Sequence, residues 1–151
     1  MTLRDILHGK GRVVHTIGSQ ATLEDVVQKL VRHNCGSLVV CEGAPRDAAE
    51  PFVGRMLGII TERDILKACA AHQAPLSTLS VAEAMTRDVL TGSPNDSVEQ
   101  TMGLMTKMRV RHLPVVEDGQ LVGLVSIGDV VKTQYDRLTM ENHYLMSYIQ
   151  G

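Results

Sequence analysis

Two short stretches of this sequence place a hydroxyl and a carboxylate at the same spacing. One runs from Gly58 to Asp64 (GIITERD), and the other runs from Gly123 to Asp129 (GLVSIGD). Each contains a glycine, two aliphatic residues, Thr or Ser, two variable positions and an aspartate. A hydroxyl, a carboxylate and free backbone N–H groups at one point can bind a polar or anionic ligand. The two stretches therefore predict two equivalent sites.

Each stretch is typical of a strand that runs directly into a helix. The aliphatic pair suits the last residues of a buried strand. Thr61 and Ser126 suit a helix N-cap, with Asp64 and Asp129 at the third helical position. Similar capping patterns begin other predicted helices, at Thr2, Thr22, Ser80 and Ser97. A capping role without any ligand is therefore the alternative for both aspartates.

The two stretches belong to an internal repeat. Thr16 aligns with Thr91 at an offset of 75 residues, and the offset falls to 65 at Gly58 and Gly123. The difference of ten residues (75 − 65) predicts an insertion in the first copy. It lies within residues 42–55, which are rich in Gly, Ala, Pro and charge, as in a surface loop.

Hydrophobic periodicity predicts a β-α-β-β-α order for each copy and a mixed α/β (α+β) fold. A short helix from Thr2 that ends at Gly9 and Gly11 precedes the first copy, which has strands at 12–17, 37–41 and 56–60 and helices from Thr22 to Asn34 and from Thr61 to Ala71. A short helix at 80–85 precedes the second copy, which has strands at 89–91, 113–116 and 121–125 and helices at 98–108 and from 127 toward 149. A break around Thr139 is left open, and Asp118-Gly119 predicts a hairpin turn. The apolar end of the last helix predicts packing on a neighbour or a second subunit.

Composition excludes several classes of function. The chain has 151 residues, 44% of them hydrophobic, and a net charge of −2, which gives no attraction to nucleic acid or a membrane. No apolar run approaches the roughly 20 residues of a membrane span. Three cysteines without CxxC spacing, and no secretory signal, predict a reduced, cytoplasmic protein.

No pattern indicates catalysis or a metal site. The six histidines show neither HxxxH nor HExxH spacing, and no P-loop or pairing of a nucleophile with a base is present. Met102, Met105 and Met108 fall at helical spacing, which favours an adaptable core stripe. We therefore expect no catalytic residue, no metal ligand and no catalytic cofactor.

Two further segments complete a recognisable pattern: GSLVV at 36–40 and VRHLPVV at 110–116. With the two junctions, they make the chain resemble a CBS domain pair, or Bateman module, that stands alone. The predicted division is an N-terminal helix (1–11), repeat one (12–73), a linker (74–82), repeat two (83–138) and a helical tail (139–151). The resemblance implies that the repeats pack about a pseudo-two-fold axis and that two such modules form a homodimer.

The resemblance also implies an adenosine-containing ligand in the cleft between the repeats: AMP, ADP, ATP, NAD(H) or S-adenosylmethionine. Asp64 and Asp129 would each bind a ribose hydroxyl pair, because a carboxylate accepts both of its donors. Thr61 and Ser126 would contact ribose or phosphate. The base would lie against Val14, His15 and Thr16 in one site and against Val89, Leu90 and Thr91 in the other. Ser37 and Pro114, from the supporting segments, complete the candidate set.

Charge predicts that the two clefts differ. Arg111 and His112 add positive charge, whereas their counterparts Gly36 and Ser37 carry none. The cleft of Asp64, facing Arg111 and His112, should prefer phosphorylated ligands. The cleft of Asp129 lacks that help and would be empty or hold a less charged adenosine. Three alternatives stay open: Arg63 binds phosphate or points to solvent, His15 contacts ligand or solvent, and His112 is a ligand contact or a half-buried strand residue.

The leading hypothesis is a regulatory or energy-sensing protein, not an enzyme, that binds an adenine nucleotide and modulates an unidentified partner. The alternative is a ligand-free scaffold that acts through its dimer surface. A nucleotide hydrolase is a third hypothesis, for which turnover abolished by Asp64→Ala would be needed.

Overall fold

A computed structural model describes residues 1–11, 13–44 and 54–150 of the chain. It is a mixed fold of helices and short strands, and the described part falls into two compact units, each built from separate stretches. Unit 1 comprises Met1–Arg12, Thr91–Val116 and Gly123–Gly151. Unit 2 comprises Val13–Leu90 and Glu117–Val122.

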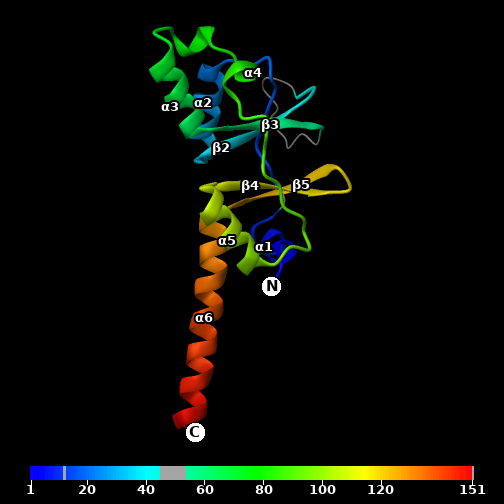
Figure 1. Ribbon diagram of the computed structural model, residues 1–151, viewed down its shortest axis with the longest axis vertical. Coiled ribbons are helices and arrows are strands. Elements are labelled where there is room, and N and C mark those ends of the chain that lie inside the picture. The colour runs from blue at the N-terminus through cyan, green and yellow to red at the C-terminus, as the bar shows by residue number, and fades with distance from the viewer. Residues whose placement is uncertain (12, 45–53, 151) are drawn as a thin grey trace. The chain divides into compact units, whose positions relative to one another are not determined.

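Unit 2 is built on a three-stranded sheet in the order β1-β2-β3 (Figure 1). The short strand β1 (Thr16–Ile17) runs parallel to β2 (Ser37–Cys41), and β2 runs antiparallel to β3 (Met56–Thr61). The helices are α2 (Leu23–His33), α3 (Glu62–Ala71) and α4 (Val81–Ala84), with a 3₁₀ turn η1 at Leu76–Thr78. Thr22 and Asp25 form the predicted capping box of α2, and Asn34 ends that helix in a left-handed conformation.

The core of unit 2 lies where these helices cover one face of the sheet. Leu38, Val40 and Ile60 project from alternate positions of β2 and β3, as the two-residue period of a strand requires. They pack with Leu23, Val26 and Leu30, which form the apolar stripe of α2. All five residues of β2 are buried, so this strand is fixed from both sides.

Unit 1 contains the hairpin of β4 (His112–Glu117) and β5 (Gln120–Ser126), apart from its tip at 117–122. Its helices are α1 (Leu3–Lys10), α5 (Val98–Met108) and α6 (Ile127–Gln150). Asp118 and Gly119 both have positive φ, 52° and 78°, which is the geometry of a type I′ turn and confirms the hairpin prediction.

Each short helix belongs to the unit that contains the other repeat. Helix α1 precedes β1–β3 in sequence but belongs to unit 1, and α4 precedes β4 and β5 in sequence but belongs to unit 2. In unit 1, Leu3 N donates to Asp96 O at 3.0 Å and Val98 N donates to Met1 O at 3.0 Å, which ties α1 to the start of α5. In unit 2, Leu23 N donates to Leu79 O at 2.9 Å and Val81 N donates to Ala21 O at 2.9 Å. The two repeats therefore exchange their first helices, and we call α1 and α4 the exchanged helices. The boundaries of the repeats along the sequence do not reveal this exchange.

Two sequence predictions need correction, and one alternative that the sequence left open is decided. The strand expected at 12–17 is β1 alone, at Thr16–Ile17, and Arg12 lies outside the described residues. No strand forms at 89–91, because this segment has no pairing partner among the described residues, and pairing begins at Gly92, which bridges to Val115. The last helix is unbroken through Thr139, since a single Thr weakens a helix by only a few tenths of a kcal/mol.

Two further expectations concern the insertion in the first copy and the lack of a membrane span. Most of the predicted insertion, residues 45–53, lies outside it. Among the helices that are described, none combines the length and the apolar character needed to cross a membrane.

Candidate functional site

The junction of β3 and α3 forms the predicted capping box around Asp64. Oδ2 of Asp64 accepts hydrogen bonds from Thr61 N at 2.9 Å and Thr61 Oγ1 at 3.1 Å. Asp64 N donates in return to Thr61 Oγ1 at 3.3 Å. Oδ1 of Asp64 accepts from Thr86 Oγ1 at 3.1 Å, and Thr86 follows the exchanged helix α4. The carboxylate is buried and thus joins the start of α3 to the segment after α4.

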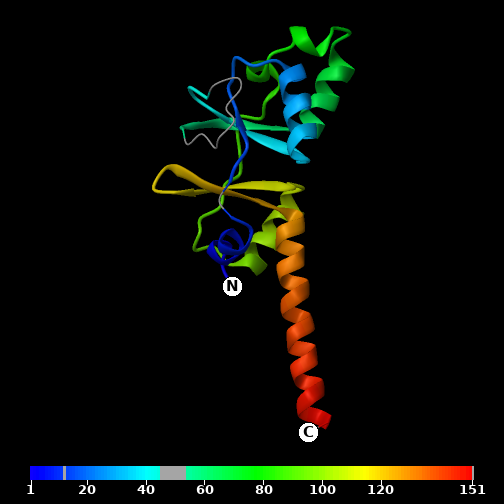
Figure 2. The same cartoon turned by 180° about the vertical axis from the view of Figure 1, so that it is seen from behind.

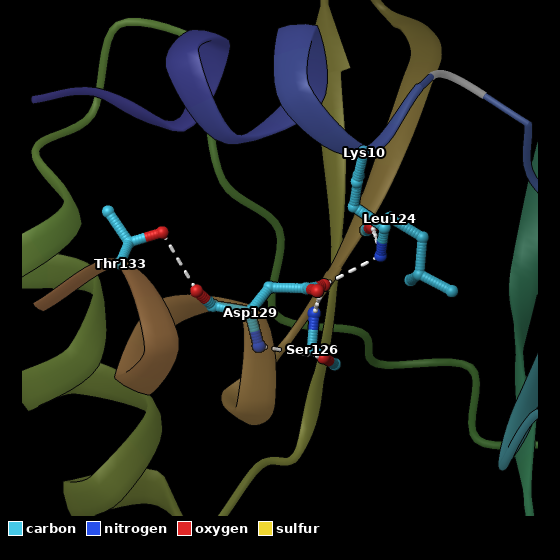
Figure 3. Close-up of polar contacts among 5 residues, drawn as sticks. All are labelled: Lys10, Leu124, Ser126, Asp129 and Thr133. Carbon is cyan, nitrogen blue, oxygen red and sulfur yellow. Dashed lines mark hydrogen bonds and ion pairs between the residues drawn. The ribbon is translucent and has the colours of Figure 1, made fainter. Parts of the chain in front are cut away.

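The junction of β5 and α6 repeats this arrangement around Asp129, with a cation in place of the threonine (Figure 3). Oδ2 of Asp129 accepts from Ser126 N at 2.8 Å, and Asp129 N donates to Ser126 Oγ at 3.1 Å. The same Oδ2 accepts from Lys10 Nζ at 2.6 Å, and Lys10 also donates to Leu124 O at 3.1 Å. Lys10 is the last residue of the exchanged helix α1, so the two exchanged segments play matched parts.

The environment of Asp129 favours its ionised form. Burial opposes ionisation, but hydrogen bonds from Lys10 and from the Ser126 backbone outweigh it, so the pKa of the carboxyl lies below its ordinary value. The Lys10 and Asp129 side chains keep 37% and 24% of their surface exposed. The pair is therefore within reach of solvent and of a solute.

The glycine that begins each stretch admits the exchanged segment. A Cβ on Gly58 would lie 2.4 Å from the carbonyl oxygen of Thr86, and Ile59 pairs with Thr86 through backbone hydrogen bonds in both directions. A Cβ on Gly123 would lie 2.5 Å from Cδ2 of Leu7 in α1. Close approach explains both glycines, because neither has a positive φ.

The two carboxylates differ in how much hydrogen-bonding capacity they retain. A carboxylate offers about four acceptor sites. Asp64 uses three of them, for two donors of Thr61 and for Thr86. Within the described residues, Oδ1 of Asp129 accepts no hydrogen bond. Both caps therefore leave capacity for a ligand hydroxyl, and more of it remains at Asp129.

Ser37 lies beside the Asp64 junction with an unused hydroxyl. It opposes Thr61 in the register of β2 and β3. Its side chain is 2% exposed, and its Oγ has no hydrogen-bond partner among the described residues. A buried polar atom without a partner costs about 1–3 kcal/mol, so a donor or acceptor supplied there would be stabilising.

The remaining candidates of unit 2 come from β1, from the residues just before it, from α3 and from the segment after α4. Val14 and Thr16 are buried, and Arg63 is exposed on α3, which leaves both of its predicted roles open. His15 is half-buried and stacks on His33 of α2, with ring centroids 3.8 Å apart. Burial first, then the nearby charges of His33 and Lys29, lower the pKa of His15. Stacking on His33 is a third environment that the sequence did not suggest. Val89 and Leu90 are half-buried.

The remaining candidates of unit 1 flank the second junction. Thr91 is exposed, and Pro114 is buried in β4, where its carbonyl accepts from Gly92 N at 2.9 Å. The Arg111 side chain is exposed, while its carbonyl accepts from Ile127 N at 2.8 Å, as Gly36 O accepts from Glu62 N at 3.1 Å. His112 is half-buried at the start of β4. The predicted site shared by Arg111, His112 and Asp64 joins residues of different units and stays a prediction.

The second junction has a cation that the sequence did not suggest, because Lys10 contacts Asp129 there. The unequal preference of the two clefts, based on Arg111 and His112, stays a prediction. Sequence reasoning missed both Lys10 and Thr86 because it did not connect either short helix with the strand–helix junction of the other repeat. The shared capping pattern of Thr2-Asp5 and Ser80-Glu83 was the available signal, since it marks both helices as equivalent elements.

A small pocket in unit 2 includes Asp64 in its lining. It lies among α2, α3 and α4, with a volume of about 160 Å³, and its lining includes Leu23, Ser80 and Glu83. Ligand pockets usually measure about 300–1,000 Å³, so this one is too small for a nucleoside. Among the described residues, no group of three His, Cys, Asp or Glu side chains is placed to hold a metal ion.

Comparisons with known proteins agree with the repeat. The sequence model of the CBS domain matches residues 3–71 and 81–136. The chain is 33% identical to the CBS domain-containing protein CBSX3, mitochondrial, of Arabidopsis thaliana, over 99% of this chain and 72% of that protein.

Solved structures give the same result. The CBS-domain containing protein ATU1752 of Agrobacterium tumefaciens has a TM-score of 0.78 and 39% identity, over 88% of this chain and 92% of that one. The CBS domain pair of protein MJ0100, solved with 5′-methylthioadenosine and S-adenosyl-L-methionine, has a TM-score of 0.71 and 28% identity, over 88% and 98%. Helix α1 lies in the first matched segment and α4 lies in the second, so each CBS repeat in the sequence includes its short helix. This chain therefore belongs to the CBS domain family and carries two copies of the domain.

Proposed function

We propose that this protein is a regulatory module that binds an adenosine-containing ligand at its two strand–helix junctions and thereby modulates a partner protein. The observation that carries the proposal is the matched pair of carboxylates, Asp64 and Asp129, which cap their helices and still retain acceptor capacity. A ribose diol offers two donors, for which Asp129 has two acceptor sites left and Asp64 has one. The ligand classes are AMP, ADP, ATP, NAD(H) and S-adenosylmethionine, and the proposal includes no catalysis.

Two further observations support this chemistry. The unpartnered Oγ of Ser37 lies one strand away from the Thr61 cap, where a ligand could satisfy it. The CBS pair of MJ0100 was solved with two adenosine compounds, 5′-methylthioadenosine and S-adenosyl-L-methionine. Ligand binding would shift the equilibrium between two states of the protein only through contacts that differ between them.

We infer that the two junctions have unequal preferences. Thr86 presents a neutral hydroxyl to Asp64, whereas Lys10 presents an ammonium group to Asp129. A ligand at Asp129 would meet a cation suited to phosphate or carboxylate. Arg111 would add to one site only, and the sequence assigned it to Asp64. Arg111→Ala should weaken anionic ligands at one site, and an equal loss at both would contradict the inequality.

Thermal unfolding of the purified protein tests the proposal. The panel is AMP, ADP, ATP, NAD, NADH and S-adenosylmethionine, with GMP as the control for adenine. A ligand at 100 times its Kd adds about 2.7 kcal/mol if it binds only the native state. That corresponds to a rise in Tm of several degrees for a chain of this size. Mass spectrometry of the denatured protein identifies any ligand that is already bound. No shift with any compound, and no bound ligand, would contradict the proposal.

The scaffold function is the second candidate, because the outer part of α6 exposes a row of large apolar side chains. A stable dimer whose Tm no adenine compound changes would favour it.

A further inference from the structure

The outer two-thirds of α6 lacks any neighbour within the described chain. Every residue from Tyr135 to Gln150 is exposed, sixteen in succession, and the helix continues past α1 and α5 (Figure 2). An isolated helix of about 12–15 residues is only marginally stable in water. Among the described residues, one ion pair forms within this stretch, between Arg137 and Glu141. A second element is therefore required to stabilise the helix.

Five of the large apolar residues exposed on α6 follow a heptad pattern, whereas Met140, Tyr144, Met146 and Tyr148 lie at other positions. Val131, Leu138 and Leu145 recur every seven residues, and Tyr135, Asn142 and Ile149 follow each of them by four. These are the d and a positions of a coiled coil, respectively. The five apolar members are all at least half exposed, between 50% and 77%. A straight seam of this period fits another helix with the same seam.

We propose that α6 pairs with α6 of a second copy of this chain in a parallel, two-stranded coiled coil over residues 131–149. This proposal is independent of the proposed ligand. It concerns a surface formed by one helix of unit 1 alone.

Asn142 sets the orientation. In a parallel, in-register pair, a positions face a positions, so Asn142 meets Asn142 of the second copy and the two amides can hydrogen-bond. In an antiparallel pair, a positions face d positions, so Asn142 would meet a leucine and lose its partner. A single Asn at an a position specifies register and the two-stranded state in parallel coiled coils.

Charge permits this arrangement. The flanking e positions hold Lys132, Thr139 and Met146, and the g positions hold Gln134, Glu141 and Tyr148. In a parallel pair, each g residue faces the e residue five positions later in the second copy, which gives Gln134 with Thr139 and Glu141 with Met146. No like charges meet along the seam.

Disulfide trapping tests the register. Cys69, the exposed cysteine of the described chain, is first replaced by Ser to remove its background reaction. Asn142→Cys is then compared with Met140→Cys, which lies at an f position on the far side of the helix. Under mild oxidation, we expect a covalent dimer from Asn142→Cys at least tenfold in excess of that from Met140→Cys. Equal yields would overturn the proposal.

Charge substitution tests the seam by a second readout. Leu138→Glu/Leu145→Glu places two carboxylates on the seam, and Met140→Glu/Ser147→Glu places the same charge on the far face. Circular dichroism should show that only the first variant loses helical signal, equivalent to about the sixteen residues from Tyr135 onward. If other surfaces also join the copies, the mass in ultracentrifugation stays dimeric while the helical signal still falls. An unchanged helical signal in the seam variant would overturn the proposal.

Discussion

The carboxylates of Asp64 and Asp129 have two roles that a single residue can fill together. Each caps its helix by accepting from the backbone of the preceding hydroxyl residue. Each also anchors an exchanged segment, through Thr86 in one case and Lys10 in the other. The capping box alone would need neither contact. The second partner differs in charge, so the chemistry offered to a ligand differs as well.

Lys10→Met tests the ion pair through the pH dependence of stability. The pKa of Asp129 is lowered in the folded protein, so its ionisation stabilises the fold above the unfolded value of about 3.9. That contribution is lost as the pH falls through the folded pKa. We therefore expect wild type to exceed Lys10→Met in free energy of unfolding at pH 7, with a gap that closes toward acid.

Urea unfolding at several pH values measures this gap. Lys107→Met is the matched control, since Lys107 is an exposed lysine on α5 of the same unit. A gap for Lys10→Met that is constant with pH, or one no larger than that of the control, would show that the ion pair does not set the pKa of Asp129.

At this scale, the sequence predicted the aspartates and their caps but not their second partners. Local spacing is enough to define a capping box, because all its atoms lie within four residues. Thr86 and Lys10 come from 22 and 119 residues away, and only the folded chain brings them together. His15 shows the same limit, because its stacking partner His33 lies on another element.

At the scale of elements, each strand–helix junction depends on a glycine that lets another segment approach. The obstacle differs between the two copies. At Gly58 the neighbour is a backbone carbonyl held in a bridge between Ile59 and Thr86. At Gly123 the neighbour is the end of the Leu7 side chain, which can change rotamer.

This difference predicts unequal costs for the same substitution. Gly58→Ala should destabilise the protein by about 1–3 kcal/mol or more, as overpacking does when the neighbour cannot move. Gly123→Ala should cost less, because Leu7 can adjust. Chemical denaturation of both variants measures the difference. A greater loss for Gly123→Ala would show that the backbone at Thr86 yields more readily than Leu7.

Most elements were predictable because their signals are local. The apolar stripe of α2, the turn at Asp118-Gly119 and the continuous β2 each depend on neighbouring residues. The predicted lengths of the first strand of each repeat were too long, because a strand exists only where a neighbouring strand pairs with it through hydrogen bonds. Residue 17 has that partner in Val40, whereas the segment at 89–91 has none among the described residues, and pairing begins at Gly92.

At the scale of the whole molecule, the exchange of first helices determines what each repeat stabilises. Leu7 of α1 is buried within unit 1, and Val81 of α4 is buried in the core of unit 2. Each of these helices belongs to the unit that contains the other repeat's strands. Repeat periodicity identifies two copies but cannot show which copy receives which helix.

Leu7→Ala and Val81→Ala form a matched test of the exchange. Truncating a buried leucine to alanine costs about 2–5 kcal/mol through lost contacts and a cavity. Leu7→Ala should increase hydrogen exchange in unit 1, at α5 and the start of α6, and Val81→Ala should increase it in unit 2, at α2 and α3. Faster exchange at 13–41 in Leu7→Ala, with α5 unchanged, would contradict the exchange.

The most direct test of the central claim is calorimetric titration of ligand into protein stripped of any bound nucleotide. AMP and S-adenosylmethionine are titrated into wild type, Asp64→Asn, Asp129→Asn and Asp25→Asn. Asp25 forms the same capping box with Thr22, with a distance of 2.9 Å from Thr22 N to Oδ2, but it lies outside the proposed sites. Loss of a charge-assisted hydrogen bond of about 1.5–3 kcal/mol corresponds to at least a tenfold loss of affinity. We predict that loss for at least one ligand in Asp64→Asn or Asp129→Asn, with Asp25→Asn equal to wild type. No binding by wild type, or equal losses in all three variants, would show that both aspartates are caps alone.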